Sequence, residues 1–238
     1  MSFRSRSKGF FSRAKITRGA FYLFCLEVGL SLVALFSNDD GQAWIVRNLV
    51  ASDVTVWRDL KVWTLVSTMF VEPRFIALLF HGMMLWMFVP ALERWWGTKR
   101  FLMFAIGVSA TAALVGTLAG SFMGDPGTHV IAGLDAMIFA CIVAYGVVYA
   151  KTQVYFFAVL PLTGKQLAWG MSGFVALMVV LNGDWSTGAG WAAAMLLALA
   201  LTSEVLSPRL MWLRWRHRRV RRHLKLVPDD DKKKRWMN

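Results

Sequence analysis

The sequence predicts an all-α membrane protein, a bundle of six transmembrane helices with a long interfacial first loop. Hydrophobic residues make up 57% of the chain and the mean hydropathy is +0.49, which is more apolar surface than a soluble core of this size can bury. Six segments are apolar over about 20 residues, the length that crosses a bilayer. Basic residues gather at the two ends and in alternate connections, as they do in multi-pass proteins.

The chain begins with a basic segment, residues 1–18, which we expect to lie in the cytoplasm. The apolar run after it has no small-x-small cleavage motif at its end, so it is interpreted as an uncleaved first span. The membrane domain is expected to cover residues 19–206, and a basic cytoplasmic tail residues 207–238. The six predicted spans are residues 19–37, 74–92, 101–123, 130–150, 166–182 and 188–206.

The first connection, residues 38–73, is long, whereas the others are short. It contains WIVRNLV and VWRDLKVWTLVSTMF, amphipathic pieces rich in Trp. Such pieces are typical of segments that lie in the membrane interface.

The distribution of Lys and Arg predicts the orientation. Of the 27 basic residues, 23 lie at the two ends and in the second and fourth connections, which share one side of a six-span bundle. We therefore expect both termini in the cytoplasm, in the inner (plasma) membrane of a bacterium. The basic tail, with Trp212 and Trp215, is expected to contact anionic lipids. It carries no nucleic-acid reading motif, so a nucleic-acid partner is not expected.

Small residues recur every four positions on three spans, which lets helix backbones approach closely in lipid. We expect the fourth and sixth spans to pack tightly against each other. The ridges are Gly116 and Gly120 in the third span, Ala132, Ala136, Ala140 and Ala144 in the fourth, and Gly190, Ala194 and Ala198 in the sixth.

Residues 63–206 resemble the rhomboid superfamily of intramembrane proteins. The segment Leu92-Glu93-Arg94-Trp95-Trp96-Gly97 matches the Leu-Glu-Arg-x-x-Gly motif that ends the family's second span. Trp63 stands at the family's Trp-Arg-x-x-Thr motif, with Thr64 in place of the arginine. The resemblance implies a rhomboid-like six-helix bundle. Its scaffold residues would be Trp63, Glu93, Arg94, Gly97 and Gly133.

Active rhomboids use a serine in Gly-x-Ser-Gly in the fourth span, a histidine in the sixth, and a His-x-x-x-Asn pair in the second. The resemblance places Asp135 at the serine, Gly190 at the sixth-span histidine, and Ala77 and His81 at the second-span pair. A carboxylate cannot replace an activated hydroxyl nucleophile, and the sixth span offers no imidazole. The resemblance therefore implies a catalytically incomplete protein of the pseudoprotease type.

A literal Gly-x-Ser-Gly occurs in the fifth span and makes Ser172 a second candidate nucleophile. The histidines that follow it, His217 and His223, lie in the basic tail. A dyad needs a proton acceptor within about 3 Å of the hydroxyl, so Ser172 is expected to serve helix packing instead.

Three functions stay open. We favour a non-catalytic rhomboid-like integral membrane protein that binds transmembrane segments of client proteins and affects their stability, assembly or trafficking. The first alternative is a rhomboid-family intramembrane serine endopeptidase in which His81, His129 or Asp135 take unorthodox roles. The second is a small-solute transporter that uses Glu27, His81 and Asp135. No cofactor is expected, and no metal site, because neither His-x-x-x-His nor Cys-x-x-Cys occurs.

His81 and Asp135 form a candidate cavity pair. The two spans are expected to enter from the outside near Phe75 and near His129, and each reaches its polar residue six positions later, on the order of 9 Å below the outer surface. An unpaired charge at mid-membrane costs roughly 2.5–3.5 kcal/mol, and less at this depth. We therefore expect the two side chains to hydrogen-bond across the cavity, although hydration of Asp135 alone is the alternative. Glu27 is expected to be hydrogen-bonded inside the bundle.

Overall fold

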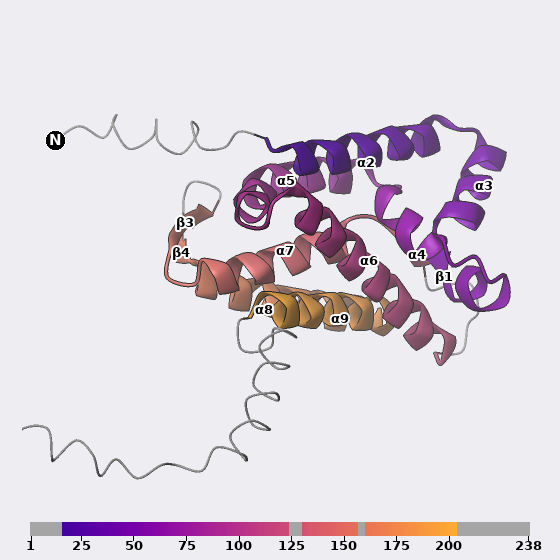
Figure 1. Ribbon diagram of the computed structural model, residues 1–238. Coiled ribbons are helices and arrows are strands. Elements are labelled where there is room, and N and C mark those ends of the chain that lie inside the picture. The colour runs from indigo at the N-terminus through magenta and orange to yellow at the C-terminus, as the bar shows by residue number, and fades with distance from the viewer. Residues whose placement is uncertain (1–15, 124–129, 157–159, 204–238) are drawn as a thin grey trace, which may run out of the picture. The chain divides into compact units, whose positions relative to one another are not determined.

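The computed structural model describes residues 16–123, 130–156 and 160–203, and most of these are helical (Figure 1). The prediction of a helical multi-pass membrane protein is confirmed. The predicted tail and most of the predicted N-terminal segment lie outside the described residues. Within the described part of the chain, five helices are long and apolar enough to cross a membrane: α2 (Arg18–Phe36), α5 (Phe75–Trp96), α6 (Thr98–Ser121), α8 (Gly164–Asn182) and α9 (Trp185–Thr202).

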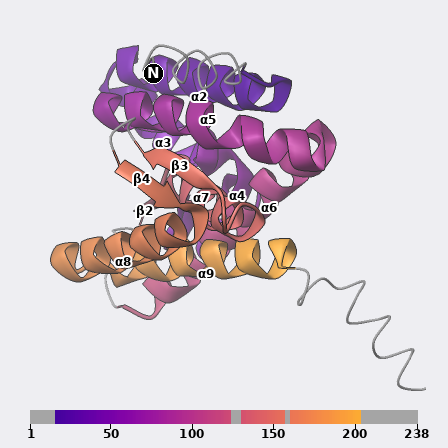
Figure 2. The ribbon, with the colours of Figure 1, turned by 90° about the vertical axis from the view of Figure 1, so that its left-hand side faces the viewer.

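The remaining apolar helix, α7 (Asp135–Val148), has 14 residues and spans about 21 Å, less than the roughly 30 Å of a bilayer core. Every residue from Ala136 to Gly146 is buried. Helices α5, α6, α8 and α9 all contact α7, which lies between α5 and the α8–α9 pair in both views (Figures 1 and 2). A helix that is apolar on all faces is stable here because neighbouring helices surround it.

The predicted span 130–150 therefore starts too early. Strand β2 (Val130–Ile131) pairs antiparallel with β1 (Ala51–Ser52), so its backbone hydrogen bonds go to the first loop rather than along a helix. Thr68 reinforces the junction, because its hydroxyl donates to the Ile131 carbonyl and accepts from the Ala51 N–H at 3.2 Å. These contacts attach the first loop to the start of α7.

The first loop is a series of short helices. They are α3 (Asp39–Leu49), the π-helical turn η1 (Val54–Arg58), α4 (Thr64–Ser67) and the 3₁₀ turn η2 (Thr68–Phe70). Asn38 caps α3 by accepting the Gly41 N–H at 3.1 Å. Trp63 lies before α4 rather than at the start of the second span, and its indole N–H donates to the Asn48 carbonyl at 2.9 Å. Trp63 therefore joins α4 to α3.

The small-residue ridge of α9 packs against two helices. Ala194 and Ala198 are fully buried, and α9 contacts α7, as the ridges predict, and also α6. At Gly190 a Cβ atom would lie 2.6 Å from the Ala112 carbonyl oxygen of α6. Gly190 therefore faces the α6 backbone at a distance that no larger residue permits.

The Leu-Glu-Arg-x-x-Gly motif ends α5 and holds the start of α2. The Glu93 carboxylate accepts the Gly19 and Ala20 N–H groups at 2.9 and 3.1 Å, and the Thr98 hydroxyl at 2.6 Å. Gly97 ends the helix with φ +82°, a conformation that favours glycine. The local sequence gives α2 no side-chain cap, and Glu93, which is distant in the sequence, supplies an anionic one.

A β-hairpin precedes α8. Strands β3 (Gln153–Phe156) and β4 (Leu160–Thr163) pair antiparallel. Thr163 and Gln166 then form a capping box that starts α8.

Candidate functional site

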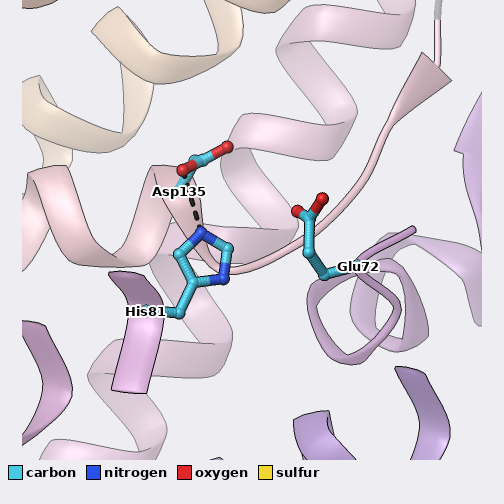
Figure 3. Close-up of side chains that lie close together, drawn as sticks. All are labelled: Glu72, His81 and Asp135. Carbon is cyan, nitrogen blue, oxygen red and sulfur yellow. Dashed lines mark hydrogen bonds and ion pairs between the residues drawn. The ribbon is translucent and has the colours of Figure 1, made fainter. Parts of the chain in front are cut away.

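Three separate segments bring ionisable side chains together beside the start of α7. Glu72 precedes α5, His81 lies in the second turn of α5, and Asp135 is the first residue of α7. Figure 3 shows the three side chains pointing toward one another. Glu72 and His81 are fully buried, whereas the Asp135 side chain is 18% exposed. The cluster thus extends from the interior of the bundle to an accessible edge.

His81 lies between two carboxylates. Its Nε2 is 3.0 Å from Asp135 Oδ1, and its Nδ1 is 2.5 Å from Oε1 of Glu27, a fully buried residue of α2. A neutral imidazole donates from one nitrogen only, whereas the imidazolium donates from both. The two contacts therefore need either a protonated ring or a second proton donor among the carboxyl groups.

Arg74 contacts the carboxylates of both Glu72 and Asp135. Its Nε donates to Glu72 Oε1 at 2.9 Å, and its Nη2 lies 3.5 Å from Asp135 Oδ2. The hydrogen bond with Glu72 raises the pKa of the Arg74 guanidinium above its usual value, so this side chain stays positively charged. On the inner side the Glu72 N–H donates to the Ser31 hydroxyl at 2.9 Å, which fixes the backbone of the acid against α2.

Gly133 forms the wall of the cluster between β2 and α7. Its φ is +79°, and a Cβ atom there would overlap the Glu72 carboxylate and lie 3.2 Å from His81 Cε1. Its N–H donates to the Thr68 carbonyl at 3.0 Å. Only glycine allows both the turn and the close approach of the acid.

A cavity of about 500 Å³ adjoins the cluster. Glu72, Arg74 and Asp135 line it together with residues from the end of α8 to the start of α9, among them Met178, Asn182, Asp184 and Trp191. The lining therefore combines acidic, basic and apolar side chains.

The structure brings some of the sequence-predicted site residues together and not others. His81 and Asp135 are in contact, and Glu27 is hydrogen-bonded inside the bundle. Ala77 lies one turn before His81 and adds no polar group. Gly190 faces α6, so it does not line the cavity. His129 lies outside the described residues.

Ser172 is separated from the cluster. Its hydroxyl donates to the Ala168 carbonyl of its own helix at 2.9 Å, and it does not line the cavity.

Asp135 lies beside His81 as expected, but the backbone that precedes it is not the helix that the sequence predicts. The fourth span does not run as a helix from residue 130, because residues 130–134 form β2 and a non-helical bend. Asp135 is thus the first helical residue rather than one turn or more inside a helix.

Glu72 and Arg74 are the site residues that sequence reasoning missed. A usable signal exists, because Glu72-Pro73-Arg74 places two opposite charges directly before the second span and after a run of apolar residues.

Comparison with known proteins gives a family match. The profile of a family described as "Eukaryotic integral membrane protein (DUF1751)" matches residues 19–204. The chain is also 30% identical over 113 residues to the Bacillus subtilis (strain 168) protein named "Putative rhomboid protease YdcA". That match covers 43% of this chain and 54% of the relative, so the chain spans about half the length of the curated relative. These findings support a rhomboid-like relationship.

Proposed function

The chain belongs to the DUF1751 family of integral membrane proteins, and we propose that it is a rhomboid-like protein that binds transmembrane segments of client proteins without cleaving them. In this proposal it affects the stability, assembly or trafficking of its clients. The proposal has the five long apolar helices of the described residues, together with the shorter α7, take the six-span rhomboid arrangement, with both termini in the cytoplasm.

The observation that carries the proposal is the chemistry of the two dyad positions. Asp135 stands where the resemblance expects the serine, and it is occupied by contacts with His81 and Arg74. At Gly190 the α6 backbone leaves no space for a side chain, and α9 contains no histidine between Trp185 and Thr202. The serine-protease reaction of active rhomboids needs a hydroxyl next to a base, and neither position supplies one.

The surface around the cavity supports binding of an apolar segment. On α8, Met178 and Val179 line the cavity, and Phe174, Leu177 and Leu181 are exposed. A hydrophobic client helix packed there would contact α8 and the polar cluster at once. Polar groups of the client would then meet Arg74 or Asp135, and such contacts distinguish one transmembrane segment from another.

Site-specific photo-crosslinking in the native membrane tests client binding. A photoreactive amino acid at Met178 is expected to capture membrane proteins, and the same group at Met103, an exposed residue of α6, serves as the matched control. Capture of the same proteins with equal yield at both positions would contradict the proposal.

The relative's name makes an intramembrane protease the second candidate. A fluorophosphonate probe and a model transmembrane substrate separate the two. The proposal expects neither labelling nor cleavage, and cleavage that disappears in Ser172→Ala would establish the protease instead.

A further inference from the structure

We propose that Glu72, His81 and Asp135 bind one divalent transition-metal ion of the zinc class, with Glu27 holding the histidine in the ligating form. The site adjoins the surface proposed for client binding, but its test does not depend on that proposal. One side chain nitrogen and two carboxylate oxygens would ligate the ion from three segments of the chain.

The positions of the three ligand groups fit a small ion. One ligand atom from each of Glu72, His81 and Asp135 lies within 4.8 Å of the other two. Zinc binds nitrogen and oxygen at about 2.0–2.2 Å, so its ligands in a tetrahedral site are about 3.4 Å apart. His81 Nε2 and Asp135 Oδ1 are 3.0 Å apart, and small side-chain rotations therefore make room for the ion.

The second nitrogen of His81 has the partner that metal-binding histidines usually have. Ligating histidines generally donate their other ring N–H to a carboxylate, which fixes the tautomer and the ring orientation. Glu27 Oε1 lies 2.5 Å from His81 Nδ1, and both side chains are fully buried. With the proton on Nδ1, the lone pair of Nε2 points to the space shared with Asp135.

Among the residues that the structure describes, two buried carboxylate oxygen atoms at the cluster find no hydrogen-bond partner. They are Oε2 of Glu72 and Oε2 of Glu27, in side chains with no exposed surface. A buried acceptor without a partner costs free energy that a ligand can recover. A metal ion at the centre of the cluster coordinates Glu72 Oε2, and Gly133 is the residue that permits this oxygen to lie so close to His81.

The charges of the cluster also match a divalent ion. In the metal-bound form, with all three carboxyl groups ionised, Glu27, Glu72 and Asp135 carry three negative charges, and Arg74 compensates one of them. With a neutral His81, two negative charges remain in a largely buried site. A divalent cation balances them, whereas a protonated His81 alone leaves one uncompensated.

The cavity gives the ion a route and a free coordination position. Asp135 and Glu72 both line it, so an ion can reach the cluster from the cavity. Zinc sites with three protein ligands usually keep the fourth position for water or another ligand.

The expectation of no metal site rested on the absence of local ligand motifs. Glu72, His81 and Asp135 are instead spread over 64 positions of the sequence and meet only through the fold, so no spacing motif can reveal them.

Metal analysis of the full chain, purified in detergent without chelators, tests the proposal. We expect about one zinc ion per chain, removable by EDTA, and a higher melting temperature when Zn²⁺ is restored. Glu72→Gln and Asp135→Asn should abolish this shift. Glu27→Gln should weaken binding about 10- to 100-fold, as the loss of an outer partner does. Asp59→Asn, which removes a carboxylate of the first loop, is the matched control and should bind like the wild type.

A wild-type measurement covers the case in which the variants fail to fold. Co²⁺ is expected to bind with one-to-one stoichiometry, to give visible absorption, and to be displaced by Zn²⁺. X-ray absorption should then show nitrogen and oxygen ligands. Absence of saturable binding in the wild type, or undiminished binding in folded Glu72→Gln and Asp135→Asn, would overturn the proposal.

Discussion

At the scale of single residues, the cluster around His81 places several charges inside an apolar helix bundle. His81, Glu27 and Glu72 have no exposed surface, so each depends on its partners for compensation. Breaking one partner of a buried ion pair typically costs about 3–5 kcal/mol, because it leaves the other charge uncompensated. The stability of the bundle is therefore sensitive to every member of this cluster.

The contact between His81 and Asp135 predicts strong coupling. Asp135→Asn and His81→Gln are each expected to destabilise the protein, and the double variant should lose at least about 1 kcal/mol less than the sum of the two. The free energy of unfolding in detergent, measured for all four proteins, gives the coupling. Ser172→Ala paired with His81→Gln is the control, since Ser172 bonds only within α8 in the described structure. Additive losses for His81 and Asp135 would contradict the contact.

Restoring the family's dyad residues is expected to fail. In the double variant Asp135→Ser with Gly190→His, the new imidazole has no space, because a Cβ atom at position 190 would lie 2.6 Å from the Ala112 carbonyl oxygen. We expect no fluorophosphonate labelling and a less stable protein, with Asp135→Ser alone as the control. Labelling of the double variant above that control would show that α6 and α9 can separate enough to form a dyad.

The sequence allowed part of this site to be predicted. The contact between His81 and Asp135 could be expected because two polar groups of opposite character occur at similar depth on neighbouring spans. A hydrogen bond of Glu27 inside the bundle could be expected as well, but its partner His81 could not, because that depends on the rotation of α2 about its axis. Glu72 and Arg74 could not either, since their positions depend on the loop conformation fixed by Thr68 and Ser31.

At the scale of elements, the Leu-Glu-Arg-x-x-Gly motif at residues 92–97 has a structural role. The Glu93 carboxylate is 3% exposed and accepts two N–H groups at the start of α2, a helix whose own N-cap makes no side-chain hydrogen bond. The motif at the end of α5 therefore holds the start of α2 against α5.

Neutralising Glu93 is expected to loosen this contact. Hydrogen bonds to a charged group contribute about 1.5–3 kcal/mol, so Glu93→Gln should lower the free energy of unfolding by about 1–3 kcal/mol. Hydrogen exchange should become faster at Gly19 and Ala20. Lys99→Gln, which removes an exposed charge of α6 near the same junction, is the control and should have little effect. Equal exchange rates in the two variants would show that Glu93 does not hold α2.

The elements that sequence reasoning placed well are those with long apolar runs. The starts and ends of α2, α5 and α8 lie within a few residues of the predicted spans. The predicted start of the fourth span, residue 130, was wrong, because Val130 and Ile131 are as apolar as α7 itself and the hydrophobic pattern includes them in the span. Their pairing with Ala51 and Ser52 depends on a strand 79 residues earlier in the sequence, which the hydrophobic pattern does not report.

At the scale of the whole molecule, α7 raises the question of how many times the chain crosses the membrane. Asp135 at its start contacts His81, and Tyr149 just after its end donates to the Ala91 carbonyl at 3.3 Å. His81 and Ala91 lie ten residues apart on α5, so α7 runs along α5 in the same direction. We propose that α7, a helix of about 21 Å that follows a spanning helix in this way, completes a crossing together with its flanking residues.

The last prediction is the resulting topology, with both termini in the cytoplasm. It follows from six crossings and from the 23 basic residues that the six-span arrangement places on one side. In a variant with Cys25 and Cys141 replaced by alanine, Arg58→Cys in the first loop should react with an impermeant maleimide from outside. Lys99→Cys, at the start of α6, should react only after the membrane is permeabilised. Tags at the two termini should likewise be accessible only from the cytoplasm. A cytoplasmic N-terminal tag with an external C-terminal tag would mean that α7 does not complete its crossing, and the proposed six-span arrangement would then be wrong.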